Sequence, residues 1–574
     1  MMTNTVMNTY QVWLNDPNID DQTKAELRSI EDQPKEIEDR FYKELAFGTG
    51  GLRGVIGAGT NRMNKYTVGK ATQGLANYMN QVFSHLSPPK AVIAHDSRHM
   101  SPEFALESAL VLAANGIETY VFHSLRPTPE LSFAVRELGA QAGIVITASH
   151  NPPEYNGYKV YNEHGGQLVI HEAAAVIEAV NQVSSFDEIR RLSKEEAERQ
   201  GLLHWIGEDI DSKYMDAVAS VSLMTEEERE LMEDIQIVYT ALHGTGGTLV
   251  PPILKRLGCK KVYTVKEQDQ PDPNFSTVKS PNPEEQAAFE IAMKLAAEVD
   301  ADIVIGTDPD ADRMGAVVKD AQGTYQILSG NQSGAIMAHY LFSRMKQRGT
   351  LPNNGVLIKT IVTSEMGAKI AESYGIEVQN TLTGFKFIGE KMTQFEQSQD
   401  KQFVFGYEES YGYLAGTYAR DKDAIVASML ISEAAAYYKG QGLTLVDVLE
   451  QLYIQHGYFQ EKLESITLKG KSGMEKIAEI MSDWRSNKPV QIGETRVEAV
   501  EDYIDGFGGL PAENVLKFKC SDGSWFCLRP SGTEPKIKVY FSVCRSSMEE
   551  SSKAMQALRS YVMDRVEQLA QGVK

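Results

Sequence analysis

The sequence predicts a protein of several α/β domains followed by a smaller α+β domain. Short apolar strands alternate with polar loops and amphipathic helices over most of the chain, which is typical of βαβ units with buried strands. After about residue 460 the pattern changes to longer, charged strands and helices. The chain has 574 residues, 42% of them hydrophobic and 24% charged, which is enough for several domains with cores of their own.

The expected elements follow one another along the chain. Apolar strand-like runs lie at 91–98, 118–122, 142–148, 235–244, 260–265, 301–306, 355–362 and 402–406, and a helix is expected over 107–116. An acidic helical stretch at 186–201 separates the first block from the second, and LSGNQSG at 328–334 marks the start of a third. Three runs, IVIT, IVIG and FVFG, lead directly into polar loops. Because ligands of open α/β sheets bind at the carboxyl ends of strands, we expect these loops to converge on one cleft.

Composition excludes several classes of protein. The chain has 57 Lys and Arg against 78 Asp and Glu, a formal net charge of −21, so we expect no nucleic-acid or membrane partner. An anionic substrate would need a local basic pocket. We find neither a run of about 18 apolar residues nor the pattern of a secretory signal. The cysteines are too few for a disulfide framework and form no C-x-x-C pair, so we expect a cytoplasmic protein.

The first of the three loops, TASHNPPEYNGYK (147–159), places Ser149 at the end of a buried strand, beside His150. An exposed, fixed serine here suits a nucleophile or a carrier of phosphate. An ordinary turn at the strand end explains the same residues equally well. The loop is no serine-hydrolase elbow, because Thr147 and Asn151 stand where G-x-S-x-G needs glycine. Lys159, ten positions on, could fold back over Ser149.

The second loop, TDPDADR (307–313), has aspartates at alternate positions, and a solvated acidic turn would explain the same residues. Clustered carboxylates repel one another unless a cation neutralises them, and oxygen ligands alone favour Mg²⁺, Mn²⁺ or Ca²⁺ over zinc. The spacing excludes an EF-hand, because Arg313 and Lys319 replace its glycine and its glutamate. Arg313 beside these acids suits an oxyanion at the metal.

Further loops add polar and basic groups. FGYEESYG (405–412) could bind sugar hydroxyls or cap a helix, and TLTGFKFIGE (381–390) adds a glycine and a lysine. RPSGTEPKIKVY (529–540) combines an arginine fork with hydroxyls and backbone amides in a tight turn, which favours a phosphate site over a plain hairpin. FGTGGLRG (47–54) is no dinucleotide fingerprint and LKGKSG (468–473) is no Walker A motif, because each lacks a required glycine.

Together, TASHNP, DPDADR, YEES and RPSGTEP, in this order, closely resemble the motifs of the α-D-phosphohexomutase family, from about Phe41 to about Val543. FGTGGLRG and FGYEESYGYL are most similar to its long phosphoglucomutase and phosphopentomutase branch. The resemblance implies three similar mixed-sheet α/β domains plus a smaller C-terminal α+β domain around a central cleft. The implied domains are a phosphoserine domain at 1–207, a metal domain at 208–327, a sugar-recognition domain at 328–458 and a phosphate-binding domain at 459–574.

The resemblance also implies roles for particular residues. Ser149 would be a phosphoserine, and one Mg²⁺ would be bound by a phosphoryl oxygen on Ser149 with Asp308, Asp310 and Asp312. Arg53 and Arg313 would touch the transferring phosphoryl group, with Lys159 as general acid/base and His150 as its active-site neighbour. The implied substrate-binding residues are Gly384, Lys386, Glu408, Ser410 and Lys422 for the sugar, and Arg529, Ser531, Gly532, Thr533 and Lys538 for the phosphate that does not react.

The implied activity is the reversible interconversion of glucose 1-phosphate and glucose 6-phosphate, with glucose 1,6-bisphosphate as intermediate and activator. Mutases of pentose or mannose phosphates, a synthase of glucose 1,6-bisphosphate and a non-catalytic sugar-phosphate-binding protein are the alternatives. The expected partner is a small phosphosugar, and the expected assembly a monomer or a homodimer. Two departures stand out: Pro309 and Ala311 replace glycines common in the metal loop, and Tyr407 stands where relatives often have glycine.

Overall fold

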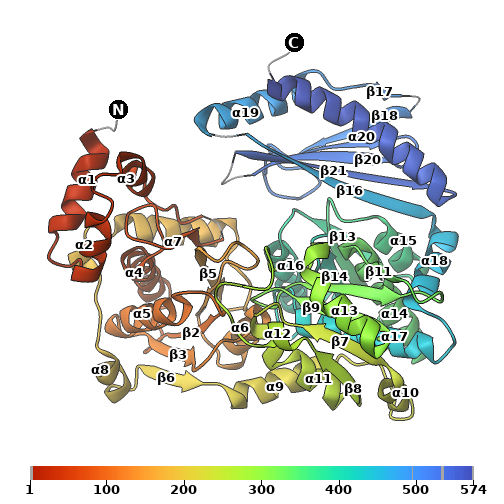
Figure 1. The fold of residues 1–574 in the computed structure, drawn as a ribbon, viewed down its shortest axis with the longest axis horizontal. Coiled ribbons are helices and arrows are strands. Elements are labelled where there is room, and N and C mark those ends of the chain that lie inside the picture. The colour runs from red at the N-terminus through yellow and green to blue at the C-terminus, as the bar shows by residue number, and fades with distance from the viewer. Residues whose placement is uncertain (1–3, 49, 469, 494, 532–534, 572–574) are drawn as a thin grey trace. The chain divides into compact units, whose positions relative to one another are not determined.

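A computed structural model describes residues 4–571 apart from 49, 469, 494 and 532–534. The chain forms two compact units, and each is described by itself. The first unit comprises 1–356 and 384–445, and the second comprises 357–383 and 446–574. Figure 1 shows the order of the elements along the chain.

The first unit begins with three helices that the sequence patterns did not single out: α1 (Asn4–Asn15), α2 (Asp21–Arg28) and α3 (Pro34–Phe41). They form a small core of their own, in which Trp13 makes edge-to-face contacts with Phe41 and Tyr66 at ring distances of 5.7 and 5.6 Å. Because Tyr66 belongs to the next helix, this core ties the three helices to the first sheet domain.

The first sheet has six strands in the order β1-β5-β4-β2-β3-β6. Its strands are β1 (Leu52–Val55), β2 (Lys90–His95), β3 (Glu118–Phe122), β4 (Ala142–Ile146), β5 (Tyr155–Asn162) and β6 (Leu203–Ile206). Its helices are α4 (Lys65–Val82), α5 (Ser101–Ala114), α6 (Thr128–Glu137), α7 (Ile170–Gln182) and α8 (Lys194–Arg199). Strands β4, β2, β3 and β6 are parallel, whereas β5 and β1 run antiparallel.

Helices cover both faces of this sheet. Ile144 on β4 lies in the core formed with α4, α5 and α7. Its neighbour Gly143 faces α6, where an added Cβ would lie 2.6 Å from Val135. Successive side chains of a strand point to opposite faces, so β4 is buried on both sides and reads as a continuous apolar run. The helix expected over 107–116 begins earlier, at Ser101, because Pro102 suits the first turn of a helix.

The second sheet has five strands in the order β11-β10-β9-β7-β8. Its strands are β7 (Gln236–Thr240), β8 (Lys261–Thr264), β9 (Ile303–Thr307), β10 (Met314–Lys319) and β11 (Tyr325–Ile327). Its helices are α9 (Glu208–Ala219), α10 (Arg229–Asp234), α11 (Val250–Arg256), α12 (Lys266–Asp269) and α13 (Glu290–Val299). Strands β8, β7 and β9 are parallel, and β10 returns antiparallel to β9. The loop TDPDADR (307–313), which we call the aspartate loop, is therefore the turn of a hairpin.

The remaining part of the first unit carries the loop at 405–412, FGYEESYG, which we call the glutamate loop. Its elements are α14 (Gly330–Gln347), α16 (Phe385–Ser398), β14 (Gln402–Glu408), β15 (Gly412–Ala415) and α17 (Ala424–Lys439). Ser329 and Gln332 form a capping box at the start of α14. The Asp423 carboxylate caps α17 by accepting hydrogen bonds from the backbone N–H groups of Ile425 and Val426.

The second unit contains the C-terminal sheet, in the order β16-β21-β20-β19-β18-β17, with every neighbouring pair antiparallel. Its first elements are β12 (Gly355–Thr360), which begins in the first unit, α15 (Met366–Ser373), β13 (Glu377–Thr381) and α18 (Leu445–His456). The C-terminal part has β16 (Tyr458–Thr467), α19 (Gly470–Ser486), β17 (Gln491–Ile492), β18 (Thr495–Asp502), β19 (Leu516–Cys520), β20 (Trp525–Pro530), β21 (Lys536–Arg545) and α20 (Met548–Gln571).

These elements confirm the predicted α/β blocks and the change to an α+β domain. The predicted strand-like runs lie on β2, β3, β4, β7, β8, β9, β12 and β14. All four cysteines are free thiols. Among the described residues, we find no helix with the length and apolar character that spanning a bilayer requires.

Candidate active site

Ser149 lies three residues beyond the end of β4, in a left-handed backbone conformation with φ 52°. This conformation costs a residue with a Cβ about 1–3 kcal/mol, so the surroundings must hold it in place. The backbone N–H of Ser149 donates a hydrogen bond to Thr147 Oγ1 at 2.8 Å. The sequence led us to expect an exposed serine, but the residue is only 5% exposed, because the aspartate loop of the second sheet lies against it.

The hydroxyl of Ser149 contacts both groups expected beside it. Ser149 Oγ donates a hydrogen bond to Asp308 Oδ2 at 2.7 Å, and it lies 3.2 Å from His150 Nδ1. Burial, with the guanidinium groups of Arg313 and Arg53, lowers the pKa of His150 well below its ordinary value. A neutral imidazole at this position can hold the serine hydroxyl without adding charge.

The three aspartates of the second loop form a compact cluster. Asp308, Asp310 and Asp312 are all buried, and each offers an oxygen within 4.8 Å of the others. Asp308 Oδ1 accepts hydrogen bonds from the backbone N–H groups of Asp312 and Arg313 at 3.1 and 3.0 Å, which fix the loop. Burial and the charges of Asp310 and Asp312 raise the pKa of Asp308 well above its ordinary value.

The donor set of this cluster fits a hard divalent cation. Among the described residues, no hydrogen bond reaches the buried oxygens Asp310 Oδ1 and Asp312 Oδ1. Unsatisfied carboxylate oxygens in the interior are costly unless a cation neutralises them. All the side-chain ligands are oxygens, as Mg²⁺ and Mn²⁺ prefer. Pro309 and Ala311 therefore leave the convergence of the three carboxylates intact.

Two lysines from distant parts of the chain contact the same aspartates. Lys159, on β5, lies with Nζ 2.9 Å from Asp310 Oδ2, and Lys422 Nζ lies 2.7 Å from Asp312 Oδ2. Burial acts to raise the pKa of Asp310, but the two ammonium groups outweigh it and lower that pKa. Burial acts to lower the pKa of Lys422, but the charge of Asp312 outweighs it and raises that pKa.

Two arginines border the loops. Arg313 pairs with Glu284 and is half-buried, and its Nε lies 3.9 Å from Asp312 Oδ1. Arg53, on β1, is exposed and donates a hydrogen bond at 3.2 Å to Asn151 Oδ1 of the loop at 147–159, which we call the serine loop. The cations expected beside Ser149 are therefore gathered from β1, β5 and the aspartate loop, and this arrangement can bind and transfer an anionic phosphoryl group.

Glu408 and Gly384 are brought together across the glutamate loop. Glu408 Oε1 accepts a hydrogen bond from the backbone N–H of Gly384 at 2.9 Å. Burial and the neighbouring charge of Glu409 raise the pKa of Glu408 to about 7. Ser410 is half-buried two residues on, and Lys386 lies in the first turn of α16, with Nζ 5.1 Å from the centre of the Phe387 ring.

Tyr407 lies on the opposite face of β14 from Glu408. An added Cβ on Gly334 of α14 would lie 2.3 Å from the Tyr407 ring, and that ring stacks on Phe405 at 5.7 Å. Because neighbouring side chains of a strand alternate, the tyrosine fills the core beneath the strand and does not share the carboxylate's face.

The second unit contains the expected phosphate loop between β20 and β21. Arg529 and Lys538 face each other directly in the register of these strands. Arg529 Nε lies 2.9 Å from Glu513 Oε1, and the backbone N–H of Ser531 donates to the Lys536 carbonyl at 2.7 Å. Gly532 and Thr533 lie outside the described residues. Two cations on neighbouring strands suit a phosphate site.

Comparisons with known proteins agree with this geometry. Models of the phosphoglucomutase/phosphomannomutase family match in chain order: α/β/α domain I at 44–186, domain II at 212–323, domain III at 329–455 and the C-terminal domain at 485–558. This chain belongs to the phosphoglucomutase/phosphomannomutase family. Four domains of this kind confirm the predicted fold class and the resemblance to phosphohexomutases, which are isomerases.

Relatives of known name support the family assignment. A phosphoglucomutase of Staphylococcus epidermidis is 40% identical over 524 residues, covering 89% of this chain and 92% of its own length. A phosphoglucomutase of Staphylococcus aureus is 38% identical over 546 residues, covering 93% and 96%.

Solved structures of the phosphoglucomutase/phosphomannomutase family share the fold. A putative phosphomannomutase from Thermus thermophilus has a TM-score of 0.69 at 21% identity, covering 92% of this chain and 99% of its own. Parafusin, a phosphoglucomutase from Paramecium solved in an open form, has a TM-score of 0.68 at 19% identity, covering 92% and 95%.

Three residues at this family site were missed in the sequence. Thr128, at the start of α6, donates from its backbone N–H to the Asp310 carbonyl and from Oγ1 to Asp310 Oδ2. Asp421 accepts a hydrogen bond from Tyr161 and lies 3.4 Å from Lys422 Nζ. Arg98 binds the serine loop. In the sequence, the one indication of Arg98 was the charged run HDSR (95–98) at the end of a predicted strand.

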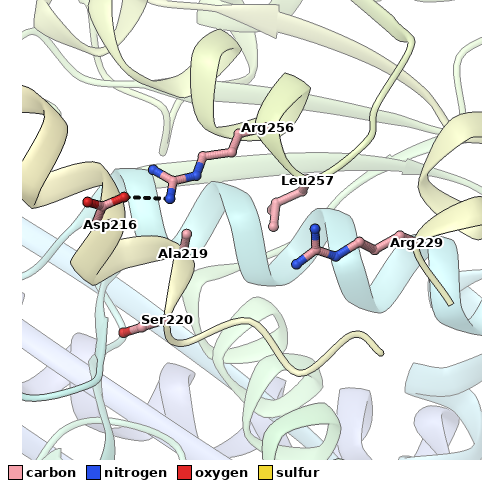
Figure 2. A pocket seen from close by; sticks show the side chains of 6 residues that line it. All are labelled: Asp216, Ala219, Ser220, Arg229, Arg256 and Leu257. Carbon is pink, nitrogen blue, oxygen red and sulfur yellow. Dashed lines mark hydrogen bonds and ion pairs between the residues drawn. The ribbon is translucent and has the colours of Figure 1, made fainter. Parts of the chain in front are cut away.

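A separate surface hollow of about 330 Å³ has no part in the phosphoglucomutase/phosphomannomutase site (Figure 2). It is lined by Asp216, Ala219, Ser220, Arg229, Arg256 and Leu257. Arg256 points toward Asp216, with Nη2 2.5 Å from Oδ1, so its charge is already neutralised. Residues expected to bind the substrate are absent from this lining.

Proposed function

We propose that this protein is a phosphoglucomutase that interconverts glucose 1-phosphate and glucose 6-phosphate. The observation that carries this proposal is the 2.7 Å contact between Ser149 Oγ and Asp308 Oδ2, within a cluster of three buried aspartates. A hydroxyl held beside such a cluster suits a phosphate carrier at a divalent cation. The relatives named phosphoglucomutase, at 40% and 38% identity, support glucose as the sugar.

In the proposed reaction, phosphorylated Ser149 gives its phosphoryl group to the 6-hydroxyl of glucose 1-phosphate. The bond between phosphorus and Ser149 Oγ breaks, a bond between phosphorus and the sugar oxygen forms, and the hydroxyl proton passes to a base. The resulting glucose 1,6-bisphosphate reorients. Its 1-phosphoryl group then returns to Ser149 Oγ, and the released sugar oxygen takes up a proton to give glucose 6-phosphate.

The described residues support a division of labour in this reaction. Asp308, Asp310 and Asp312, with a phosphoryl oxygen on Ser149, would hold one Mg²⁺, which when bound neutralises charge on the phosphoryl oxygens. Arg53 and Arg313 would bind the same oxygens and stabilise the charge that develops during transfer. Lys159 would act as general acid/base, and His150 would hold the serine hydroxyl through Nδ1.

Substrate recognition is proposed to use two sets of groups. Glu408 and Ser410 would bind sugar hydroxyls, supported by the backbone of Gly384 and by Lys386 and Lys422. The phosphate that does not react would be bound by Arg529, Ser531, Gly532, Thr533 and Lys538. A site that contacts only phosphate accepts either end of the sugar, which the proposed reaction requires because one serine serves both steps.

The serine test uses an assay in which glucose 6-phosphate is consumed by a coupled dehydrogenase. Ser149→Ala should lose at least about 10³-fold in kcat, because the phosphate carrier is removed. It should still bind glucose 1-phosphate in a calorimetric titration. Ser343→Ala, a half-buried serine on α14, is the matched control and should retain activity. Undiminished turnover in Ser149→Ala would contradict the proposal.

A panel of sugar phosphates tests the choice of sugar. We expect kcat/KM to be higher for glucose 1-phosphate than for mannose 1-phosphate or ribose 1-phosphate. A preference for mannose or ribose would assign a phosphomannomutase or a phosphopentomutase instead. A protein that binds glucose 1-phosphate without Mg²⁺ dependence, and whose intact mass is unchanged by phosphatase, would be a non-catalytic binding protein.

We further propose one Mg²⁺ per chain, glucose 1,6-bisphosphate as activator, a cytoplasmic location, and a monomer or homodimer. Within the part of the chain that the structure describes, Asp308, Asp310 and Asp312 form the one cluster that could hold a metal ion, which supports one cation. The requirement for a phosphorylated serine supports activation by a bisphosphate that can phosphorylate it. Four free thiols suit a reducing compartment.

A further inference from the structure

Arg98 binds the backbone of the serine loop from beneath. The residue is 2% exposed and lies three positions beyond the end of β2. Its Nη1 donates hydrogen bonds to the carbonyls of Pro152 and Tyr155 at 2.8 and 3.0 Å. Its Nη2 donates to the carbonyl of Ser149 at 2.6 Å and to that of Asn151. One guanidinium therefore binds four carbonyls of this loop.

Among these four carbonyls, that of Pro152 also accepts a hydrogen bond from the Tyr155 N–H at 3.1 Å, but the loop is short of donors of its own. Pro152 and Pro153 have no backbone N–H, and the left-handed turn at Ser149 interrupts regular hydrogen bonding. Ser149 is buried, and a buried carbonyl without a partner is costly, so the Arg98 guanidinium stabilises this conformation as an outside donor. The planar fork of an arginine can serve several acceptors at fixed angles, which a lysine ammonium cannot do.

The position of Arg98 is itself fixed by Asp96, two residues before it in the chain. Asp96 Oδ2 lies 3.3 Å from Arg98 Nε, and both side chains are fully buried. Asp96 Oδ1 accepts hydrogen bonds from the Arg98 backbone N–H and from Ser101 Oγ. The backbone N–H of Asp96 donates to the Ile146 carbonyl at the end of β4. The arginine is thus tied to the strand from which the serine loop leaves.

The opposite side of Arg98 meets the domain of the second sheet, which carries the aspartate cluster. The Arg98 guanidinium lies 4.9 Å from the centre of the Phe275 ring, which is 1% exposed. The neighbouring His99 Nε2 lies 2.8 Å from Asn274 Oδ1. A cation over an aromatic face is attracted to it, more strongly where water is excluded. Arg98 therefore contacts both the loop that carries Ser149 and the domain that carries Asp308.

We propose that Arg98 is a positioning residue, which holds Ser149 in the conformation that places its hydroxyl against Asp308, with Phe275 fixing the guanidinium. This inference rests on the proposed function. The charge of Arg98 is balanced by Asp96, so we expect Arg98 to act through the geometry of the loop. A displacement of about 1 Å at a reacting atom is enough to cost about 100-fold in rate.

The test measures how fast glucose 1,6-bisphosphate phosphorylates dephosphorylated protein, followed by intact mass. Arg98→Lys keeps the charge but cannot serve four carbonyls, so the phosphorylation rate and kcat should each fall about 10- to 100-fold. KM for glucose 1-phosphate and the affinity for Mn²⁺ should stay within about threefold of wild type, because Arg98 is buried and is neither a proposed metal ligand nor a proposed substrate-binding residue. A general folding defect would not lower the phosphorylation rate and kcat while leaving KM and the Mn²⁺ affinity unchanged.

Arg344→Lys is the matched control. Arg344 is 3% exposed, pairs with Glu228, donates to the Leu223 carbonyl and lies 4.4 Å from the centre of the Tyr437 ring. It should lower the melting temperature as Arg98→Lys does but leave the phosphorylation rate unchanged. An equal loss of rate in Arg344→Lys, or a rate in Arg98→Lys within threefold of wild type, would overturn the inference.

Phe275→Leu decides the question if Arg98→Lys does not fold. Leucine keeps the apolar cover but removes the aromatic face, so the phosphorylation rate should fall about 3- to 10-fold with KM unchanged. A wild-type rate in this variant would overturn the inference. Failure of the wild-type protein itself to be phosphorylated would instead contradict the proposed function, so the two failures are distinguishable.

Discussion

Lys159 Nζ lies 2.9 Å from Asp310 Oδ2, although the two residues are 151 positions apart in the chain. Lys159 belongs to β5, the strand that returns antiparallel beside the strand leading to Ser149. Asp310 belongs to the hairpin turn between β9 and β10. This ion pair joins the general acid/base proposed for the reaction to the proposed metal ligands, so the serine loop and the aspartate loop act as one site.

Loss of one aspartate should weaken metal binding directly. In Asp308→Asn, we expect the affinity for Mn²⁺, measured by electron paramagnetic resonance, to fall by more than the roughly 10- to 100-fold typical of outer-shell partners. Chelation of wild-type protein should abolish mutase activity, and added Mg²⁺ should restore it. Asp300→Asn is the control, because Asp300 is exposed and its left-handed backbone suits asparagine. Unchanged Mn²⁺ affinity in Asp308→Asn would reject the proposed ligand set.

The pH dependence of kcat/KM should report the titration of Glu408. Its pKa is raised to about 7 by burial and by Glu409, so the carboxylate that we propose accepts hydrogen bonds from sugar hydroxyls becomes protonated as pH falls through 7. Glu409→Gln removes a negative neighbour, lowers the pKa of Glu408 and should move the acid limb to lower pH. In Glu408→Gln, the acid limb of the kcat/KM profile should come only from the titration of the substrate phosphate. An unshifted acid limb in Glu409→Gln would argue against this role.

Much of the site was predictable because three apolar strands end in loops that carry its chemistry. The ends of β4, β9 and β14 place Ser149, Asp308 and Glu408 as the sequence predicted. Arg98 also follows a strand, but its partners are backbone carbonyls 51–57 positions away, which no side-chain pattern reveals. The burial of Ser149 was also missed, because the loop that covers it belongs to the second sheet and lies far away in the sequence.

The fold shows the same limit of local patterns. The alternation of strands and helices predicted parallel neighbours, and these form the centres of the first two sheets. The antiparallel strands β5 and β10 return through loops too short for a crossover helix, so they depend on local hairpin geometry. The N-terminal helices α1–α3 bury small clusters of aromatic residues whose partners are distant in sequence.

Arg529 should contribute mainly to substrate binding. Arg529→Ala should raise KM for glucose 1-phosphate about 10- to 100-fold, with a smaller change in kcat, because hydrogen bonds to a charged group are lost. Steady-state kinetics at saturating Mg²⁺ gives both values. Arg545→Ala is the control and should leave KM unchanged, because Arg545 pairs with an aspartate, as Arg529 pairs with a glutamate, but lies at the end of β21 away from the phosphate loop. A fall in kcat with constant KM would assign Arg529 a different role.

Asp423 should be important for stability. Its fully buried carboxylate accepts hydrogen bonds from Tyr214 and Tyr418 and caps α17. Asp423→Ala should lower the free energy of unfolding by about 3 kcal/mol or more, because two buried hydroxyls and a helix end lose their acceptor. Urea denaturation measures the change. Ser193→Ala, at the exposed cap of α8, should cost only about 1 kcal/mol, and equal losses would contradict this assignment.

The most direct test of the account is to map the phosphoryl group after dephosphorylated protein is mixed with glucose 1,6-bisphosphate and Mg²⁺. We predict one phosphoryl group per chain, on Ser149 in the peptide that spans 147–159, and none in Ser149→Ala. Mutase activity in wild-type protein with no phosphate on this peptide, or equal incorporation in Ser149→Ala, would contradict the account.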